Sequence, residues 1–122
     1  MTALLVFLGG GLGALARLGL NEGISKLTGD RFPLGILACN VLGCFLIGLA
    51  SGYLSRSAPS WFTPLIMIGF LGGFTTFSTF ARDTVNLFTE RGLALAAANI
   101  LLSVCVCLFA VLLGLKLSQT SS

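Results

Sequence analysis

Residues 72–80, with the sequence GGFTTFSTF, lie in the middle of a long apolar stretch and carry the groups best suited to chemistry. Glycine and β-branched threonine both weaken helices, so we expect the helix to be broken here. In lipid, non-helical backbone is tolerated only where it is buried in protein or lines a cavity. Its free carbonyls can hold a cation, and its half-helix N-terminus favours an anion. The alternative is an ordinary helix whose hydroxyls bond back to carbonyls one turn earlier, but the density of weak helix formers favours the break.

Two further sets of polar groups lie inside apolar stretches. Asn40 brings an amide donor into one of them, where it serves either as interhelical glue or as a functional group. Asn99, Ser103 and Cys107 recur every four residues, so they share one helical face. The spacing predicts a polar line along that helix.

The cysteines do not suggest a metal or redox centre. No C-x-x-C pair occurs, and the chain contains no histidine. Zinc and redox sites need clustered ligands at characteristic spacings. The four thiols are therefore interpreted as small packing residues, at Cys39, Cys44, Cys105 and Cys107.

Four long helices must position these groups. Hydrophobic residues make up 56% of the chain and charged residues only 9%, whereas a soluble domain carries about 25% charged residues. The charged residues separate four apolar stretches, and roughly 20 residues suffice to cross the hydrocarbon core. The sequence predicts an all-α membrane protein with one domain over residues 1–122 and transmembrane helices at about 2–20, 33–55, 62–90 and 92–116.

The first stretch also has a feature of a signal peptide. Its Ala14-Leu15-Ala16 fits a small-residue cleavage pattern, but no Lys or Arg precedes the apolar run. A transmembrane helix is therefore favoured. It reaches about Leu20 if Arg17 snorkels or faces the protein interior.

The loop charges do not strongly select an orientation. With four spans, both termini and the second loop share one side, which carries Arg56 and Lys116. The other side carries Lys26, Arg31 and Arg91. Since loop Lys and Arg set orientation, this near balance leaves open both dual insertion and a single, weakly biased orientation. The loops are predicted at about residues 21–32, 54–61 and 89–92.

Many of the 16 glycines are spaced for close helix packing. Gly9 and Gly13 form a small-x-x-x-small pair in the first stretch, and Gly43 and Gly48 give the second a thin face. Close backbone approach supplies the packing energy between helices in lipid. We interpret most of these glycines as packing residues.

Three segments together resemble the CrcB/Fluc fluoride channels. They are GFLGGFTTFSTFARD at residues 69–83, GGGLGALAR at 9–17 and PLGILACNVLG at 33–43. The resemblance covers essentially the whole chain. It implies an antiparallel, dual-topology homodimer with two fluoride pores and a structural sodium ion at the dimer interface. It further implies passive fluoride export across the inner membrane of a prokaryotic cell, which lowers cytoplasmic fluoride.

The family's site residues map onto this chain through those motifs. The carbonyls that hold sodium match Gly72 and Thr75. The pore phenylalanines match Phe77 and Phe80, whose electropositive ring edges can face an anion without holding it firmly. The other matches are the pore asparagine at Asn40, hydroxyls near the pore at Ser78, Thr79 and Ser103, and vestibule or ion-pair residues at Arg17 and Asp83.

The chain departs from the family pattern in two places. Asp83 stands where the family commonly has glutamate, and it is expected to pair with Arg17 or Arg82. Asn99 and Cys107 lie at the two ends of the polar line in the last span. Their roles stay open.

The main alternative function is a small four-helix, proton-coupled multidrug exporter. Such a protein needs a membrane-embedded carboxylate, and Asp83 lies only at the far end of the third stretch. An enzyme is not favoured, because no histidine is present and no carboxylate stands beside a nucleophile. A membrane protein without transport would not need the costly break. The net charge of +3 is spread thinly, without the basic patch that a nucleic acid partner requires.

Overall fold

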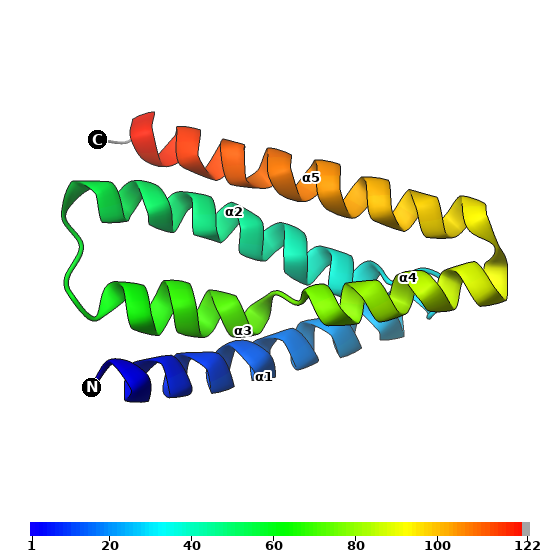
Figure 1. The fold of residues 1–122 in the computed structure, drawn as a ribbon, viewed down its shortest axis with the longest axis horizontal. Helices are drawn as coiled ribbons and strands as arrows, with labels where there is room; N and C mark the ends of the chain where they lie inside the picture. Colours follow the sequence, from blue (N-terminus) through cyan, green and yellow to red (C-terminus); the bar gives the residue numbers. More distant parts are fainter. Residues whose placement is uncertain (121–122) are drawn as a thin grey trace.

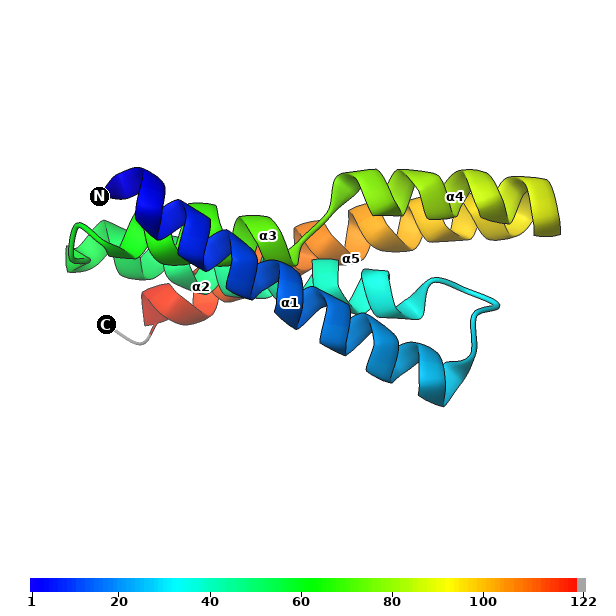
Figure 2. The same cartoon turned by 90° about the horizontal axis from the view of Figure 1, so that it is seen from below.

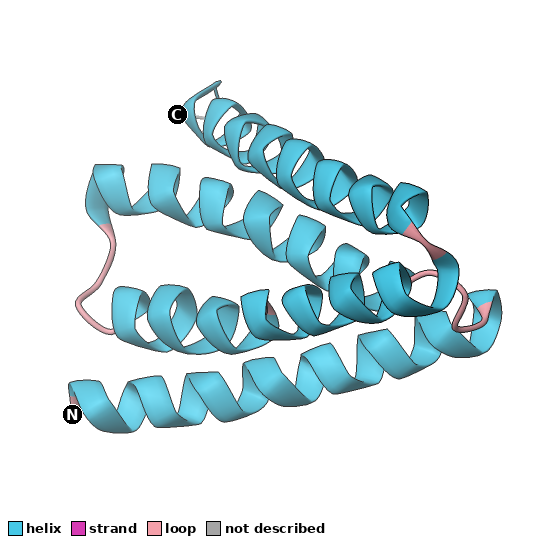
Figure 3. Cartoon of the chain, turned by 45° about the vertical axis from the view of Figure 1, so that its right-hand side comes forward, coloured by secondary structure: helices cyan, strands magenta, loops and turns pink. Residues whose placement is uncertain are grey.

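The computed structural model describes residues 1–120, which are helical apart from short connections (Figure 3). No strand occurs in this part of the chain. The helical elements, in order, are α1 (Thr2–Thr28), α2 (Leu34–Ser57), η1 (Thr63–Leu71), α3 (Gly72–Phe74), α4 (Phe77–Arg91) and α5 (Leu93–Thr120). Element η1 is a π-helix that runs directly into the single turn of α3.

The described chain has four helical segments long and apolar enough to cross a membrane: Thr2–Thr28, Leu34–Leu54, Thr63–Arg91 and Leu93–Thr120. They confirm the four predicted spans. The segments alternate in direction, and both termini lie at the same end as the connection between α2 and η1 (Figure 1). The chain is therefore arranged as sequence analysis predicted for four successive membrane crossings.

The predicted end of the first helix is wrong. Helix α1 continues to Thr28 instead of ending near residue 20. Hydropathy marks where a helix leaves an apolar environment, and the helix continues beyond that point. Glu22 and Lys26 are spaced four apart, which supports a solvated helical turn. Gly29 then ends the helix with φ 80°, a conformation that glycine adopts without steric cost.

The two halves of the third span pack against different helices. The η1–α3 half lies across α1, whereas α4 lies along α5 (Figure 2). Helix α2 packs chiefly against α5. The connection between α3 and α4 therefore lies where the third span changes its packing partner.

Glycines permit the closest helix contacts, as the sequence predicted. A Cβ atom on Gly9 of α1 would overlap the Leu65 carbonyl of η1. Gly48 of α2 and Gly114 of α5 face one another, and a Cβ atom on either would lie 3.1 Å from the other's Cα. These contacts fix the spacing of the helices around the candidate site.

Candidate functional site

The site begins at an interruption of the third span, residues Thr75 and Thr76. Both have extended backbone, with φ −90° and ψ 155° at Thr75 and φ −151° and ψ 123° at Thr76. Helix α4 starts afresh after them, and the Thr76 hydroxyl accepts a hydrogen bond from the Thr79 amide at 3.2 Å. This is an N-cap, and it satisfies one of the amides that a helix start leaves without a partner.

Asn40 of α2 pairs with the interrupted backbone. Its Nδ2 donates to the Thr76 carbonyl at 3.1 Å, and its Oδ1 accepts from the Thr76 amide at 2.8 Å. One side chain thus satisfies both backbone groups of a residue that has left the helix. An unpaired backbone group in an apolar environment would cost several kcal/mol, at roughly 2–7 depending on the reference state.

Arg17 of α1 contacts the same interruption from the other side. Its Nη1 donates to the Gly73 carbonyl at 2.8 Å and to the Thr75 carbonyl at 3.3 Å. These carbonyls end the first half of the span, where the helix dipole places partial negative charge. Of the two partners expected for Asp83, Arg82 is the one that the structure shows, with its Nη2 3.6 Å from the Asp83 carboxylate.

A groove beside the interruption contains several of the predicted pore residues. Its volume is about 330 Å³, and Asn40, Phe77, Phe80 and Ser103 all contribute to its walls. The Phe77 and Phe80 rings lie 5.4 Å apart between centroids and are tilted by 49°. The Phe77 ring is 77% exposed, so the groove is open on that side. The other groove residues are Cys44, Thr75, Thr76, Val104, Cys107 and Leu108.

Ser78 and Thr79, predicted near the pore, are not among the groove residues. Each residue of an α-helix is rotated by about 100° from its predecessor. Phe77 and Phe80 therefore share a face that the two intervening residues cannot share. The exposed Ser78 hydroxyl lies 3.3 Å from that of Thr76.

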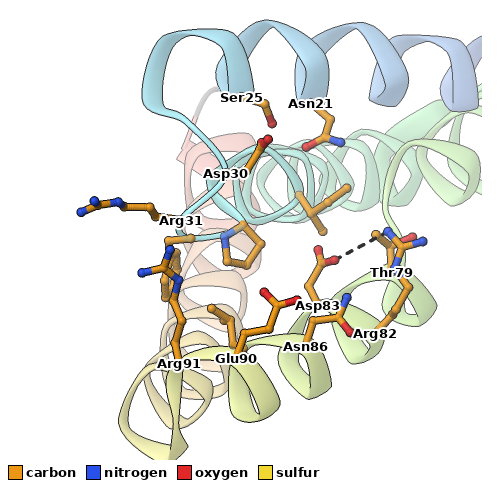
Figure 4. A pocket seen from close by; sticks show the side chains of 14 residues that line it. Asn21, Ser25, Asp30, Arg31, Thr79, Arg82, Asp83, Asn86, Glu90 and Arg91 are labelled. Atoms are coloured by element: carbon orange, nitrogen blue, oxygen red, sulfur yellow. Dashed lines mark ion pairs between the residues drawn. The ribbon is translucent and has the colours of Figure 1, made fainter.

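Thr79 instead lines a second, charged pocket of about 250 Å³. Figure 4 shows carboxylates and guanidinium groups of α4 facing the connection between α1 and α2. Asp83 lines this pocket, whereas Arg17 does not. The charged residues of this pocket are Asp30, Arg31, Arg82, Asp83, Glu90 and Arg91.

The predicted cation ligands are the backbone carbonyls of Gly72, the first residue of α3, and of Thr75, which directly follows α3. In a continuous α-helix the Thr76 amide would donate to the Gly72 carbonyl, but it donates to Asn40. The Gly72 carbonyl therefore loses its helical donor, and Gly72 lies exposed. The Thr75 carbonyl already accepts from Arg17, although a carbonyl oxygen has a second lone pair. Two hard oxygen atoms per chain are compatible with a sodium ion shared between two chains.

The polar line on α5 divides into two roles. Asn99 is 1% exposed, and its Nδ2 donates to the Thr84 hydroxyl at 2.9 Å. That hydroxyl donates in turn to the Phe80 carbonyl at 2.8 Å. Asn99 thus holds α4 against α5, whereas Ser103 and Cys107 face the groove.

Sequence reasoning did not single out Thr84 or Cys44. Thr84 follows Phe80 by one helical turn, a spacing at which a hydroxyl can bond back to the earlier carbonyl. Cys44 follows Asn40 by one turn, so it lies on the same face of α2. Both four-residue spacings are visible in the sequence and could have identified Thr84 and Cys44 as neighbours of the site residues.

Comparison with known proteins gives a consistent result. A family model described as "CrcB-like protein, Camphor Resistance (CrcB)" matches residues 4–115. A protein of Pseudoalteromonas translucida named "Fluoride-specific ion channel FluC" is 44% identical over 115 residues, covering 93% of this chain and 96% of its own. Its namesake in Solibacter usitatus is 43% identical over 122 residues, covering 98% and 99%. The namesake in Coxiella burnetii is 40% identical over 123 residues, covering 98% of each chain.

Proposed function

The chain belongs to the CrcB family, and we propose that it is a fluoride-specific ion channel of the cell membrane. It is a multi-pass membrane protein with four spans. The observation that carries the proposal is the groove in which Asn40, Phe77, Phe80 and Ser103 come together. Passive flow through it would export fluoride across a prokaryotic inner membrane and lower its cytoplasmic concentration.

The groove offers a few donors within apolar walls, which suits a small anion that must shed its water. Asn40 uses one N–H on the Thr76 carbonyl, which leaves the second for an anion. The Ser103 side chain lines the same groove, and its hydroxyl can donate a hydrogen bond. Phenylalanine ring edges carry positive potential. These groups can replace water around fluoride while holding it weakly enough for it to leave.

We further propose that two chains assemble antiparallel in the membrane. Three observations support this assembly: the groove is open, the Phe77 ring is 77% exposed and Gly72 is exposed. A two-fold axis in the membrane plane would let one chain's Phe77 cover the other's groove. The near balance of loop charge between the two ends permits the opposite insertion that such a dimer requires.

A sodium ion between the two chains is part of the same proposal. Gly72 and Thr75 of each chain would supply four carbonyl oxygens, which suit a hard cation. The ion would supply positive charge that holds these oxygens together at the centre of the dimer.

Fluoride efflux from liposomes tests the function directly. Purified protein is reconstituted into vesicles loaded with potassium fluoride or potassium chloride, and an ion-selective electrode follows release after a potassium ionophore is added. We expect rapid fluoride release and negligible chloride release, with no dependence on an imposed pH gradient. Equal release of both anions would refute fluoride selectivity. Transport that requires a proton gradient would favour the exporter.

A further inference from the structure

Two thiols lie together in the groove. Cys44 of α2 and Cys107 of α5 both line it, and the two side chains are close enough to interact. Each follows a polar groove residue by one helical turn, Cys44 after Asn40 and Cys107 after Ser103. The thiols therefore form the next layer of side chains along the same path.

The helices that carry these thiols are held at a fixed separation. One turn beyond Cys44, Gly48 of α2 packs directly against Gly114 of α5. A Cβ atom added to Gly48 would lie 3.1 Å from the Gly114 Cα atom. Helices α2 and α5 are also the most extensively packed pair in the described chain. The packed backbones thus bring the two thiols to the same part of the groove, and both are free thiols.

Two adjacent thiols and no third ligand select a particular class of metal ion. The described residues contain no cluster of three or more His, Cys, Asp or Glu side chains that could hold a metal. Zinc requires four ligands in a structural site, or three and a water in a catalytic one. Soft thiolate ligands favour soft cations such as Cu(I). Cations that accept two sulfur ligands, such as Cu(I), Ag(I) and Hg(II), match this pair.

We propose that Cys44 and Cys107 form a two-thiolate site for a soft, two-coordinate metal ion, and that the bound ion blocks the groove. Each S–H group releases its proton to water, the metal bonds to both sulfur atoms, and no electron is transferred. The bound ion would occupy the layer after Asn40 and Ser103, where an anion must pass. The blocking step rests on the proposed channel function, whereas metal binding does not.

The other two cysteines provide matched controls. Cys39 is fully buried, and its sulfur donates to the Arg17 carbonyl at 3.8 Å. Cys105 is exposed and, two residues before Cys107, lies on a different face of α5. Neither lines the groove.

Silver ion is the probe of choice, because silver fluoride is soluble and nitrate can replace chloride in every buffer. We titrate purified protein with silver nitrate and measure bound silver per chain after gel filtration. One tightly bound ion per chain is expected in the parent, in Cys39→Ala and in Cys105→Ser. Cys44→Ser and Cys107→Ser should each lose it, and Cys44→Ala and Cys107→Ala repeat the test with a smaller apolar side chain.

Fluoride efflux provides the second measurement. Micromolar silver should slow efflux at least tenfold in the parent and in Cys105→Ser, and excess dithiothreitol should restore it. Cys44→Ser and Cys107→Ser should be resistant. Silver binding that survives loss of either groove thiol, or that disappears with Cys105→Ser, would overturn the site. Binding at the pair without slowed efflux would overturn the block. A parent that binds silver at the pair but conducts no fluoride would refute the channel function and leave the metal site standing.

Discussion

The side-chain amide of Asn40 exchanges two hydrogen bonds with the backbone of Thr76, one in each direction. The same amide lines the groove through which we propose that fluoride moves. Asn40 therefore serves the backbone of the third span and the ion path at once. Variants at this position should affect both stability and flux.

Asn40→Leu should abolish both hydrogen bonds while keeping the side-chain volume similar. Each backbone group left unsatisfied costs about 1–3 kcal/mol, so the midpoint of thermal unfolding in detergent should fall clearly. Fluoride efflux should fall at least tenfold. Asn86→Leu on the exposed face of α4 is the control, with a stability change within about 0.5 kcal/mol. An Asn40→Leu protein with parental stability would contradict this account of the interruption.

The pore phenylalanines can be separated from packing residues by changing them to isoleucine. Phe77→Ile and Phe80→Ile remove the electropositive ring edge but keep an apolar side chain, so we expect folded protein with efflux reduced at least tenfold. The measurement is flux per folded channel, quantified after size-exclusion chromatography. Phe88→Ile, also exposed on α4 but outside the groove, should conduct like the parent.

Phe74 is a poor control for that experiment, although it lies in the same segment. Its side chain is 4% exposed, and its ring stacks on Phe70 with centroids 5.9 Å apart. Phe74→Ile should cost about 1–3 kcal/mol, since it disturbs a packed core position. Loss of stability with normal flux per folded channel is therefore the expected result. Equal flux in all three variants at positions 74, 77 and 80 would refute the assignment of the pore.

Arg17 should tolerate lysine only in part. Its Nη1 donates to the carbonyls of both Gly73 and Thr75, and a lysine ammonium keeps the charge but is a more strongly hydrated point charge on a different stem, so it does not place its donors in the same way. Arg17→Met should lose about 1.5–3 kcal/mol per charged hydrogen bond removed, and Arg17→Lys should fall between it and the parent. Thermal unfolding measures the series.

Arg82→Met is the matched control for Arg17. The Arg82 side chain is 70% exposed, and its ion pair with Asp83 is a surface contact that contributes about 0–1 kcal/mol. If Arg82→Met destabilised the protein as much as Arg17→Met, the carbonyl contacts of Arg17 would not account for the stability lost in Arg17→Met.

The contact between Gly48 and Gly114 predicts that a single methyl group will separate α2 from α5. Gly48→Ala and Gly114→Ala should each cost about 1–3 kcal/mol through overpacking. Gly23→Ala in α1 has open space around its Cβ position, so it should be neutral or stabilising by up to about 1 kcal/mol. If Gly48→Ala and Gly114→Ala unfolded at the same temperature as Gly23→Ala, that result would argue against the observed spacing of α2 and α5.

Replacing sodium tests the proposed cation between two chains. Dialysis into N-methylglucamine salts should leave four carbonyl oxygens of Gly72 and Thr75 facing one another without a cation. We expect slower efflux and a larger dissociated fraction on size-exclusion chromatography, both reversed by sodium. Unchanged flux and assembly after exhaustive sodium removal would refute the site.

Sequence analysis located the four spans because the charged residues separate them cleanly. It misplaced the end of α1, since the last part of that helix, residues 21–28, can continue in water without an apolar signal. The interruption at Thr75 and Thr76 lies within the segment whose glycines and hydroxyls predicted weak helix formation. Composition identified that segment, but it could not specify which residues leave the helix.

Side-chain partners were harder to predict than spans. One groove contains Asn40, Phe77, Phe80 and Ser103. These four residues could be named from the sequence because the family resemblance selected them. The partner of Arg17 was not foreseen, since backbone carbonyls become available only where a helix is interrupted, and sequence patterns describe side chains. Ser78 and Thr79 came from the resemblance by position, and position does not specify which way a side chain points.

The order of the polar contacts along the chain has a consequence for biogenesis. Synthesis proceeds from the N-terminus, so Arg17 and Asn40 reach the membrane before Thr75 and Thr76, whose backbone groups they satisfy. A third span released into lipid ahead of the first two would carry bare amides and carbonyls at great cost. In this chain the helices that carry Arg17 and Asn40 are synthesised first. The interrupted segment can therefore enter a bilayer that already contains its hydrogen-bond partners.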